Sequence, residues 1–215
     1  MDRLQMLRAV DGRILFNTDA AGLPREQTQE LLCRLNFIIV TEDPTRMLRF
    51  YANEHMGEAK YRRGADIEQA PLEVDCSSFI QWLYGRIGIE LPRRSIQQYD
   101  FGEPVSGFHV GDLVFKSGRK NYFDKDRPEW RIGHVGIITE VEGMEGTVIH
   151  AVDGDGITLE SLARFVNSSG FRGARHIVEN LEKWLVLDIP PGLRRRIKTA
   201  DDVKWLVLTN SINML

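Results

Sequence analysis

The most regular pattern in the chain is an amphipathic helix that begins beside a cysteine. Its apolar stripe consists of Phe79, Ile80, Leu83, Tyr84 and Ile87. Gly88 is suited to end this helix, and Asp75 stands where an N-cap residue belongs. Cys76 therefore falls in the first turn, where backbone N–H groups and the helix dipole favour a thiolate.

Segments with a strand pattern cluster after this helix. They are DLVFK (112–116), HVGIITEV (134–141), GTVIHA (146–151) and FRGARHIV (171–178), while TLESLARFVN (158–167) predicts a short helix. Two further helical patterns open upstream, at Pro24 and Pro44. Helices first and strands later predict an α+β fold, with a largely antiparallel sheet packed against helices.

The two ends of the chain are less regular. RILF (13–16) predicts a short strand, and KWLVL occurs twice, at 183–187 and 204–208, which we interpret as two β-prone segments. We divide the chain into a partly helical N-terminal extension (1–43), a central domain (44–178) and a C-terminal extension of unknown role (179–215).

Composition narrows the classes of function. A net charge of −3 over 215 residues argues against a nucleic-acid-binding protein. The N-terminus lacks the apolar stretch of a secretory signal, and no run approaches the roughly 18 apolar residues of a membrane span. We therefore expect a cytoplasmic protein without a membrane or nucleic-acid partner. Signal-independent export and phage release stay open, and the sequence does not give the oligomeric state.

The two cysteines have different surroundings. Cys33 is flanked by leucines inside a helical pattern, which predicts a core residue, whereas Cys76 is placed for reactivity. No CxxC or HExxH motif is present, so we expect neither a metal nor a cofactor.

Two histidines fall on neighbouring predicted strands downstream of Cys76. His134 begins one strand and His150 lies near the end of the next. Depending on the register of the hairpin, the two imidazoles face each other directly or lie as diagonal neighbours on one face of the sheet. A thiol nucleophile needs a base and a group that orients the base, so Cys76, His134 and His150 are the candidate catalytic residues.

Five segments give the sequence a family resemblance. YRRGA (61–65), DCSSFIQWLYGRIGIELPRRS (75–95), GDLVF (111–115), HVGII (134–138) and VIHA (148–151) occur in the order typical of NlpC-type cell-wall peptidases. The central domain thus resembles these papain-like cysteine peptidases. The resemblance implies a nucleophile at Cys76, a base at His134 and an orienting residue at His150. It also implies a substrate groove lined by Tyr61, Asp75, Ser77 and Ser95, although Asp75 is equally suited to act only as a helix cap.

The same resemblance implies a substrate. Enzymes of this type hydrolyse peptidoglycan stem peptides, usually between D-glutamate, through its γ-carboxyl group, and a diamino acid. An acyltransferase or an amidase acting on another substrate with the same Cys–His pair is an alternative, and so is a non-catalytic binding module.

One long charged segment interrupts the family pattern. Lys116–Arg131 joins two predicted strands and carries a net charge of +3. It predicts a basic flap that attracts anionic peptides, or else a solvated surface loop.

Overall fold

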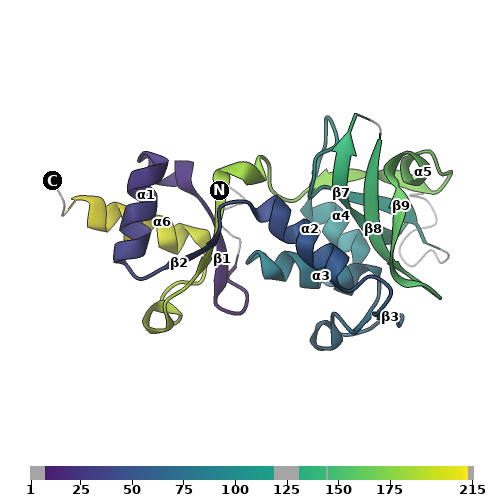
Figure 1. The fold of residues 1–215 in the computed structure, drawn as a ribbon, viewed down its shortest axis with the longest axis horizontal. Coiled ribbons are helices and arrows are strands. Elements are labelled where there is room, and N and C mark those ends of the chain that lie inside the picture. The colour runs from purple at the N-terminus through teal and green to yellow at the C-terminus, as the bar shows by residue number, and fades with distance from the viewer. Residues whose placement is uncertain (1–7, 119–130, 144, 213–215) are drawn as a thin grey trace. The chain divides into compact units, whose positions relative to one another are not determined.

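The computed structural model describes residues 8–118, 131–143 and 145–212 (Figure 1). These residues form two compact units. The first comprises residues 1–47, 84–90 and 180–215, and the second comprises residues 48–83 and 91–179. Both terminal extensions recognised in the sequence thus contribute to the same unit. None of the helices in the described ranges is long and apolar enough to cross a membrane.

The first unit is a small sheet covered by two helices. Its elements are β1 (Arg13–Asn17), α1 (Arg25–Arg34), β2 (Ile38–Thr41), β11 (Trp184–Asp188), α6 (Ala200–Ile212) and short 3-10 helices at Thr18–Ala21, Leu181–Lys183 and Pro191–Leu193. The strand order is β1-β11-β2, and both pairings are antiparallel. The core joins Phe16 and Leu185 from the sheet to Leu32 of α1 and Val203 of α6.

The two copies of KWLVL differ in structure. Residues 184–187 of the first copy lie in β11, as predicted, but the second copy lies inside α6, so the second strand prediction is wrong. A capping interaction explains the helix. The carboxylate of Asp202 accepts hydrogen bonds from the backbone N–H of Thr199 at 2.9 Å and from its hydroxyl at 3.0 Å. Such a cap stabilises the first turn and overrides the β propensity of the residues that follow.

The second unit carries a six-stranded sheet. Its elements are α2 (Pro44–Glu54, which begins in the first unit), β3 (Lys60–Tyr61), a 3-10 turn (Ile67–Gln69), β4 (Glu73–Val74), α3 (Cys76–Arg86, which ends in the first unit), α4 (Ser95–Phe101), β5 (Glu103–Pro104), β6 (Leu113–Ser117), β7 (Ile132–Glu142), β8 (Glu145–Val152), β9 (Gly156–Ser161), α5 (Leu162–Val166) and β10 (Phe171–His176). The order in the sheet is β5-β10-β6-β7-β8-β9, with every neighbouring pair antiparallel.

Helices cover both faces of this sheet. On one face, Leu162 and Phe165 of α5 pack against Val114 and Val148. Side chains alternate along a strand, so Phe115 points to the other face, where it meets Tyr99 of α4 at a ring-centroid distance of 5.1 Å. The predicted α+β class, with an antiparallel sheet packed against helices and Cys76 at a helix N-terminus, is confirmed (Figure 1).

The segment 158–167 corrects one expectation. The sequence predicts a helix there, but residues up to Ser161 form β9, which pairs with β8 over six residues. The helix begins only at Leu162, where the Ser161 hydroxyl accepts a hydrogen bond from the backbone N–H of Arg164 at 3.2 Å. Residues 157–161, ITLES, form a strand because they pair with β8, and a local sequence pattern does not predict such pairing.

Candidate active site

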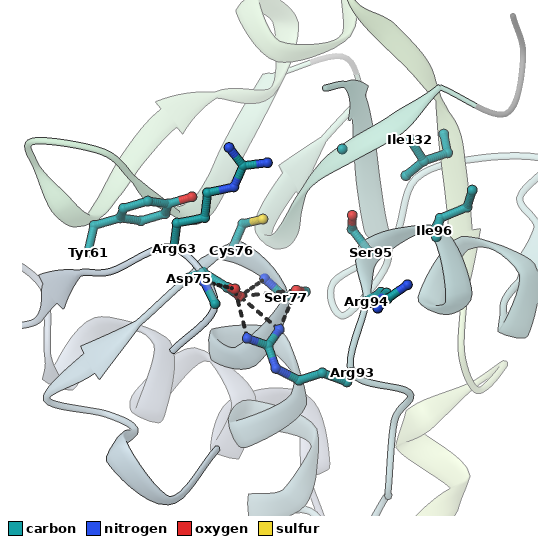
Figure 2. A pocket seen from close by; sticks show the side chains of 12 residues that line it. Tyr61, Arg63, Asp75, Cys76, Ser77, Arg93, Arg94, Ser95, Ile96 and Ile132 are labelled. Carbon is teal, nitrogen blue, oxygen red and sulfur yellow. Dashed lines mark hydrogen bonds and ion pairs between the residues drawn. The ribbon is translucent and has the colours of Figure 1, made fainter. Parts of the chain in front are cut away.

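A groove of about 420 Å³ lies in the second unit, around the start of α3 (Figure 2). It is lined by Tyr61, Arg63, Gly64, Asp75, Cys76, Ser77, Arg93, Arg94, Ser95, Ile96, Ile132 and Gly133. These residues come from β3 and the segment after it, from the start of α3 and the residue before it, from the start of α4 and the two residues before it, and from the start of β7. All four predicted substrate-binding residues therefore line the groove together with Cys76, although their roles stay predictions.

Cys76 is the first residue of α3, and its side chain is 7% exposed. Its sulfur points into the groove between Arg63 and Ser95 (Figure 2). Burial and the nearby Asp75 carboxylate raise the pKa of the thiol to about 12, although hydrogen bonds from the backbone N–H groups of Val135 and Ser77 lower it. Desolvation thus outweighs the helix-start effect that the sequence favoured, and the resting thiol is protonated.

Cys33 is not the core residue that the sequence predicted. It is exposed, whereas Thr28, Leu31 and Leu32 are the buried residues of α1. Successive residues turn by about 100° around a helix, so Cys33 leaves the face that Leu32 buries.

Asp75 caps α3 and is itself enclosed by donors. Its Oδ1 atom accepts from the backbone N–H groups of Ser77 at 3.0 Å and Ser78 at 2.8 Å. Its Oδ2 atom accepts from the backbone N–H of Gly64 at 3.0 Å, which ties the YRRGA segment to the helix start. Burial alone raises the pKa of this carboxyl, but hydrogen bonds from Arg93, Ser78 and Ser77 together hold it below its usual value. The capping role foreseen for Asp75 is therefore present.

Arg93 completes this arrangement and was not recognised in the sequence. Its guanidinium reaches both oxygens of Asp75, at 3.1 and 2.8 Å, and the hydroxyl of Ser77 at 2.9 Å (Figure 2). It also donates to the carbonyl of Ala65 at 2.5 Å. Such a bidentate pair fixes geometry as well as charge. In the sequence Arg93 stands in LPRRS, two residues before Ser95, but nothing local to this motif shows that its partner is Asp75.

Tyr61, Ser77 and Ser95 have distinct environments. Burial, followed by electrostatic repulsion from Cys76 and Asp75 when the tyrosine ionises, raises the pKa of Tyr61 to about 12, so its hydroxyl remains a proton donor at neutral pH. The hydroxyl of Ser77 donates to Asp75 at 3.0 Å. Ser95 opens α4 and is buried, with its side chain on the groove wall opposite Tyr61 (Figure 2).

The two histidines touch each other. His134 on β7 and His150 on β8 bring Nε2 and Nδ1 to 2.8 Å. Ile137 pairs with Ile149, so Gly136 lies across from His150, and His134 is its diagonal neighbour. Of the two registers left open by the sequence, the diagonal one occurs. A Cβ atom at Gly136 would lie 2.6 Å from Val148 Cγ1 and 3.2 Å from His150 Cβ, so this strand position has no room for a side chain.

Burial also controls the charge of this pair. It lowers the pKa of His134, with smaller contributions from His150 and Lys116. Burial lowers the pKa of His150 as well, and Lys116 adds to this effect, while Glu160 opposes it. Both imidazoles are therefore neutral at pH 7, which leaves one nitrogen of each ring as an acceptor. His134 is adjacent to Gly133, a groove residue, and to Val135, whose N–H reaches Cys76.

The predicted basic flap cannot be compared with these findings. Residues 119–130 of the segment Lys116–Arg131 lie outside the described residues. The two ends of this segment are described. Lys116 belongs to β6 and forms an ion pair with Glu160.

Comparison with known proteins identifies the family. The model of the NlpC/P60 family matches residues 57–175, more than half of the sequence. The chain belongs to this family. Its fold is accordingly papain-like, as the sequence resemblance implied. Over 133 residues the chain is 29% identical to the peptidoglycan DL-endopeptidase CwlO of Bacillus licheniformis, an alignment that covers 58% of this chain and 26% of CwlO. The chain thus spans about a quarter of the length of this curated relative.

Solved structures of NlpC/P60 proteins are similar to this chain. A Staphylococcus aureus protein of the NLP/P60 family shares 27% identity, with a TM-score of 0.47 over 64% of this chain and 42% of that one. NlpC2 of Trichomonas vaginalis shares 20% identity, with a TM-score of 0.49 over 66% and 48% of the two chains. RipD of Mycobacterium tuberculosis, described as a non-catalytic NlpC/p60 domain protein, shares 19% identity, with a TM-score of 0.46 over 63% and 98%.

Proposed function

We propose that this NlpC/P60 chain is a cysteine peptidase that hydrolyses peptidoglycan stem peptides with Cys76, His134 and His150. The contact of 2.8 Å between His134 Nε2 and His150 Nδ1 carries the proposal, together with the hydrogen bond that the backbone N–H of Val135, the residue after His134, gives to Cys76. His150 occupies Nε2 of His134, so Nδ1 is the nitrogen left for the thiol. The family and the likeness to a peptidoglycan DL-endopeptidase support the substrate class. We infer that the bond joins the γ-carboxyl group of D-glutamate to a diamino acid.

The reaction starts from a neutral thiol and a neutral imidazole. As Sγ of Cys76 attacks the carbonyl carbon, its proton passes to Nδ1 of His134, and the π electrons of the carbonyl move to oxygen. The backbone N–H of Cys76 is the candidate donor to this oxyanion. His134 then protonates the leaving amine while the C–N bond breaks, which leaves a thioester on Cys76.

Water completes the cycle. His134, again neutral, accepts a proton from water as the oxygen attacks the thioester carbonyl. The C–S bond breaks, the proton returns to sulfur, and the peptide is released as a carboxylic acid. Binding of an amine or alcohol in place of water would make the same site an acyltransferase.

Mass spectrometry of defined muropeptides tests the function. We expect a stem peptide with a γ-D-glutamyl–diamino acid bond to yield two products whose combined mass exceeds that of the substrate by one water. A matched peptide linked through the α-carboxyl group should stay intact. Cys33→Ala is the control variant that keeps cleavage, and Cys76→Ala is the variant that abolishes it. Transfer of the acyl group to an added amine, or binding without cleavage, would contradict the proposal in favour of a transferase or a binding module.

A further inference from the structure

A partly buried carboxylate lies next to His150, on the strand that pairs with β8. Glu160 of β9 pairs with Val148, so its side chain is a diagonal neighbour of His150 on the same face of the sheet. Its Oε2 atom lies 3.8 Å from His150 Nε2 and 3.0 Å from Lys116 Nζ. The side chain of Glu160 is 16% exposed. The histidine pair is thus continued by an ion pair that the family resemblance did not assign.

Phe165 packs these groups together. Lys116 Nζ lies 3.8 Å from the centroid of the Phe165 ring. The same ring stacks on His134 at 6.3 Å and meets the edge of His150 at 5.7 Å. Three elements, β6, β9 and α5, therefore build one support for the two imidazoles. Electrostatic effects are strong in such a water-poor cluster.

The position of Glu160 discriminates between the two hydrogen-bonding directions of the histidine pair. In the first, Nε2–H of His134 donates to Nδ1 of His150, and the proton of His150 sits on Nε2, facing the carboxylate. In the second, Nδ1–H of His150 donates to His134, and a bare lone pair of His150 faces the negative charge. The first direction is attractive and leaves Nδ1 of His134 free to act as a base, whereas the second is repulsive and blocks the base.

We propose that Glu160, held by Lys116, is a positioning residue that fixes His150 as the Nε2–H tautomer and so keeps Nδ1 of His134 available to Cys76. The catalytic consequence rests on the proposed function, but the tautomer does not. Lys116 has a second effect. It balances the carboxylate, so that His150 is oriented without becoming an imidazolium ion. Arg164 reaches the other oxygen of Glu160 at 3.4 Å but is 82% exposed, so solvent screens its contribution.

The tautomer can be measured without any substrate. Imidazole ¹⁵N shifts of the wild-type protein should report His150 protonated on Nε2 and His134 protonated on Nε2 at pH 7. The variant Glu160→Gln keeps the shape of the side chain, but its amide offers either an oxygen or an NH₂ group to His150. We expect this variant to populate both tautomers. A wild-type His150 protonated on Nδ1 would overturn the proposal whether or not the variant folds.

The pKa values of the two histidines supply a second test, because two variants should shift the pKa of His150 in opposite directions. Among the described residues, the charged groups that act on the pair or on its carboxylate partner are Lys116, Glu160 and Arg164. Removal of the carboxylate in Glu160→Gln should lower the pKa of His150 further, because an imidazolium ion loses a stabilising charge. Removal of the ammonium group in Lys116→Met should raise the pKa of both histidines by about one unit. Arg164→Gln is the matched control, with a much smaller shift.

Kinetics then connect the tautomer to catalysis. On a cleavable stem peptide, Glu160→Gln should lower kcat about tenfold with KM unchanged, as is usual for a residue that orients another ligand or base. The acid limb of the pH profile should move up in Lys116→Met. An unchanged kcat in Glu160→Gln would overturn the positioning role. If the wild type cleaves no stem peptide while the NMR results are as expected, the proposed substrate fails and the assignment of Glu160 stands.

Discussion

The two cysteines of this chain each lie on a helix, and their surroundings differ at every level. Cys76 begins α3, is buried, and receives N–H groups from its own helix and from the neighbouring strand β7. Cys33 lies next to the last residue of α1 and is exposed. A helix end alone therefore does not make a nucleophile. The residues that surround the thiol, contributed by other elements, make it a nucleophile.

The largest difference is expected when each thiol is deleted. Cys76→Ala removes the nucleophile, so kcat/KM on a stem peptide should fall at least about a thousandfold, while Cys33→Ala should retain wild-type turnover. Circular dichroism should show both variants folded. Comparable losses in two folded variants would contradict the assignment of Cys76.

The next comparison separates the two histidines. His134→Asn removes the general base, so we expect a loss of about 10²–10⁴ in kcat. In His150→Asn the amide oxygen still accepts the hydrogen bond from Nε2 of His134, so the loss should be only about tenfold. Single-turnover rates on the same peptide measure the chemical step directly. Equal losses would mean that His150 reacts rather than orients.

The smallest effect concerns the residue that anchors Cys76. Asp75→Asn retains an oxygen for the cap of α3 but loses the charge paired with Arg93, which should cost about 1–2 kcal/mol in the free energy of unfolding. Asp43→Asn is the matched control, because Asp43 caps α2 through the N–H of Arg46 at 2.9 Å. Its loss should be smaller, within about 1 kcal/mol.

Urea denaturation at pH 7 measures both aspartate variants. The pKa of Asp75 is depressed, so its contribution is present above the unfolded value and disappears as the pH falls through the folded one. The difference in the free energy of unfolding between the wild type and Asp75→Asn should therefore disappear in acid. If Asp75→Asn binds and cleaves its substrate normally, Asp75 is a helix cap and has no role in the groove.

The sequence predicted the parts of the molecule that local signals control. A capped, periodic pattern located α3 with Cys76 at its start, and alternation located β7 and β8. The sequence pattern failed where the same five residues occur in two different structural contexts. KWLVL becomes a strand between β1 and β2 but a helix after the Thr199–Asp202 cap. Its tryptophan is accordingly buried at Trp184 and 61% exposed at Trp205.

The residues of the candidate site likewise include some that the sequence predicted and some that it did not. Chemically distinctive residues at family spacings, Cys76, His134 and His150, could be named from the sequence alone. Arg93 and Glu160 could not, because charged residues are usually solvated and only tertiary contacts reveal their partners. Arg93 reaches Asp75 across 18 residues, and Lys116 reaches Glu160 across 44.

The glycine across from His150 has a consequence for protein engineering. Two imidazoles on adjacent antiparallel strands do not come into contact through their own chemistry alone, because the residue between them must leave space. At Gly136 even an alanine methyl group would collide with Val148. Anyone who transplants this histidine pair onto another sheet should therefore copy three positions, His-x-Gly on one strand and His on the next.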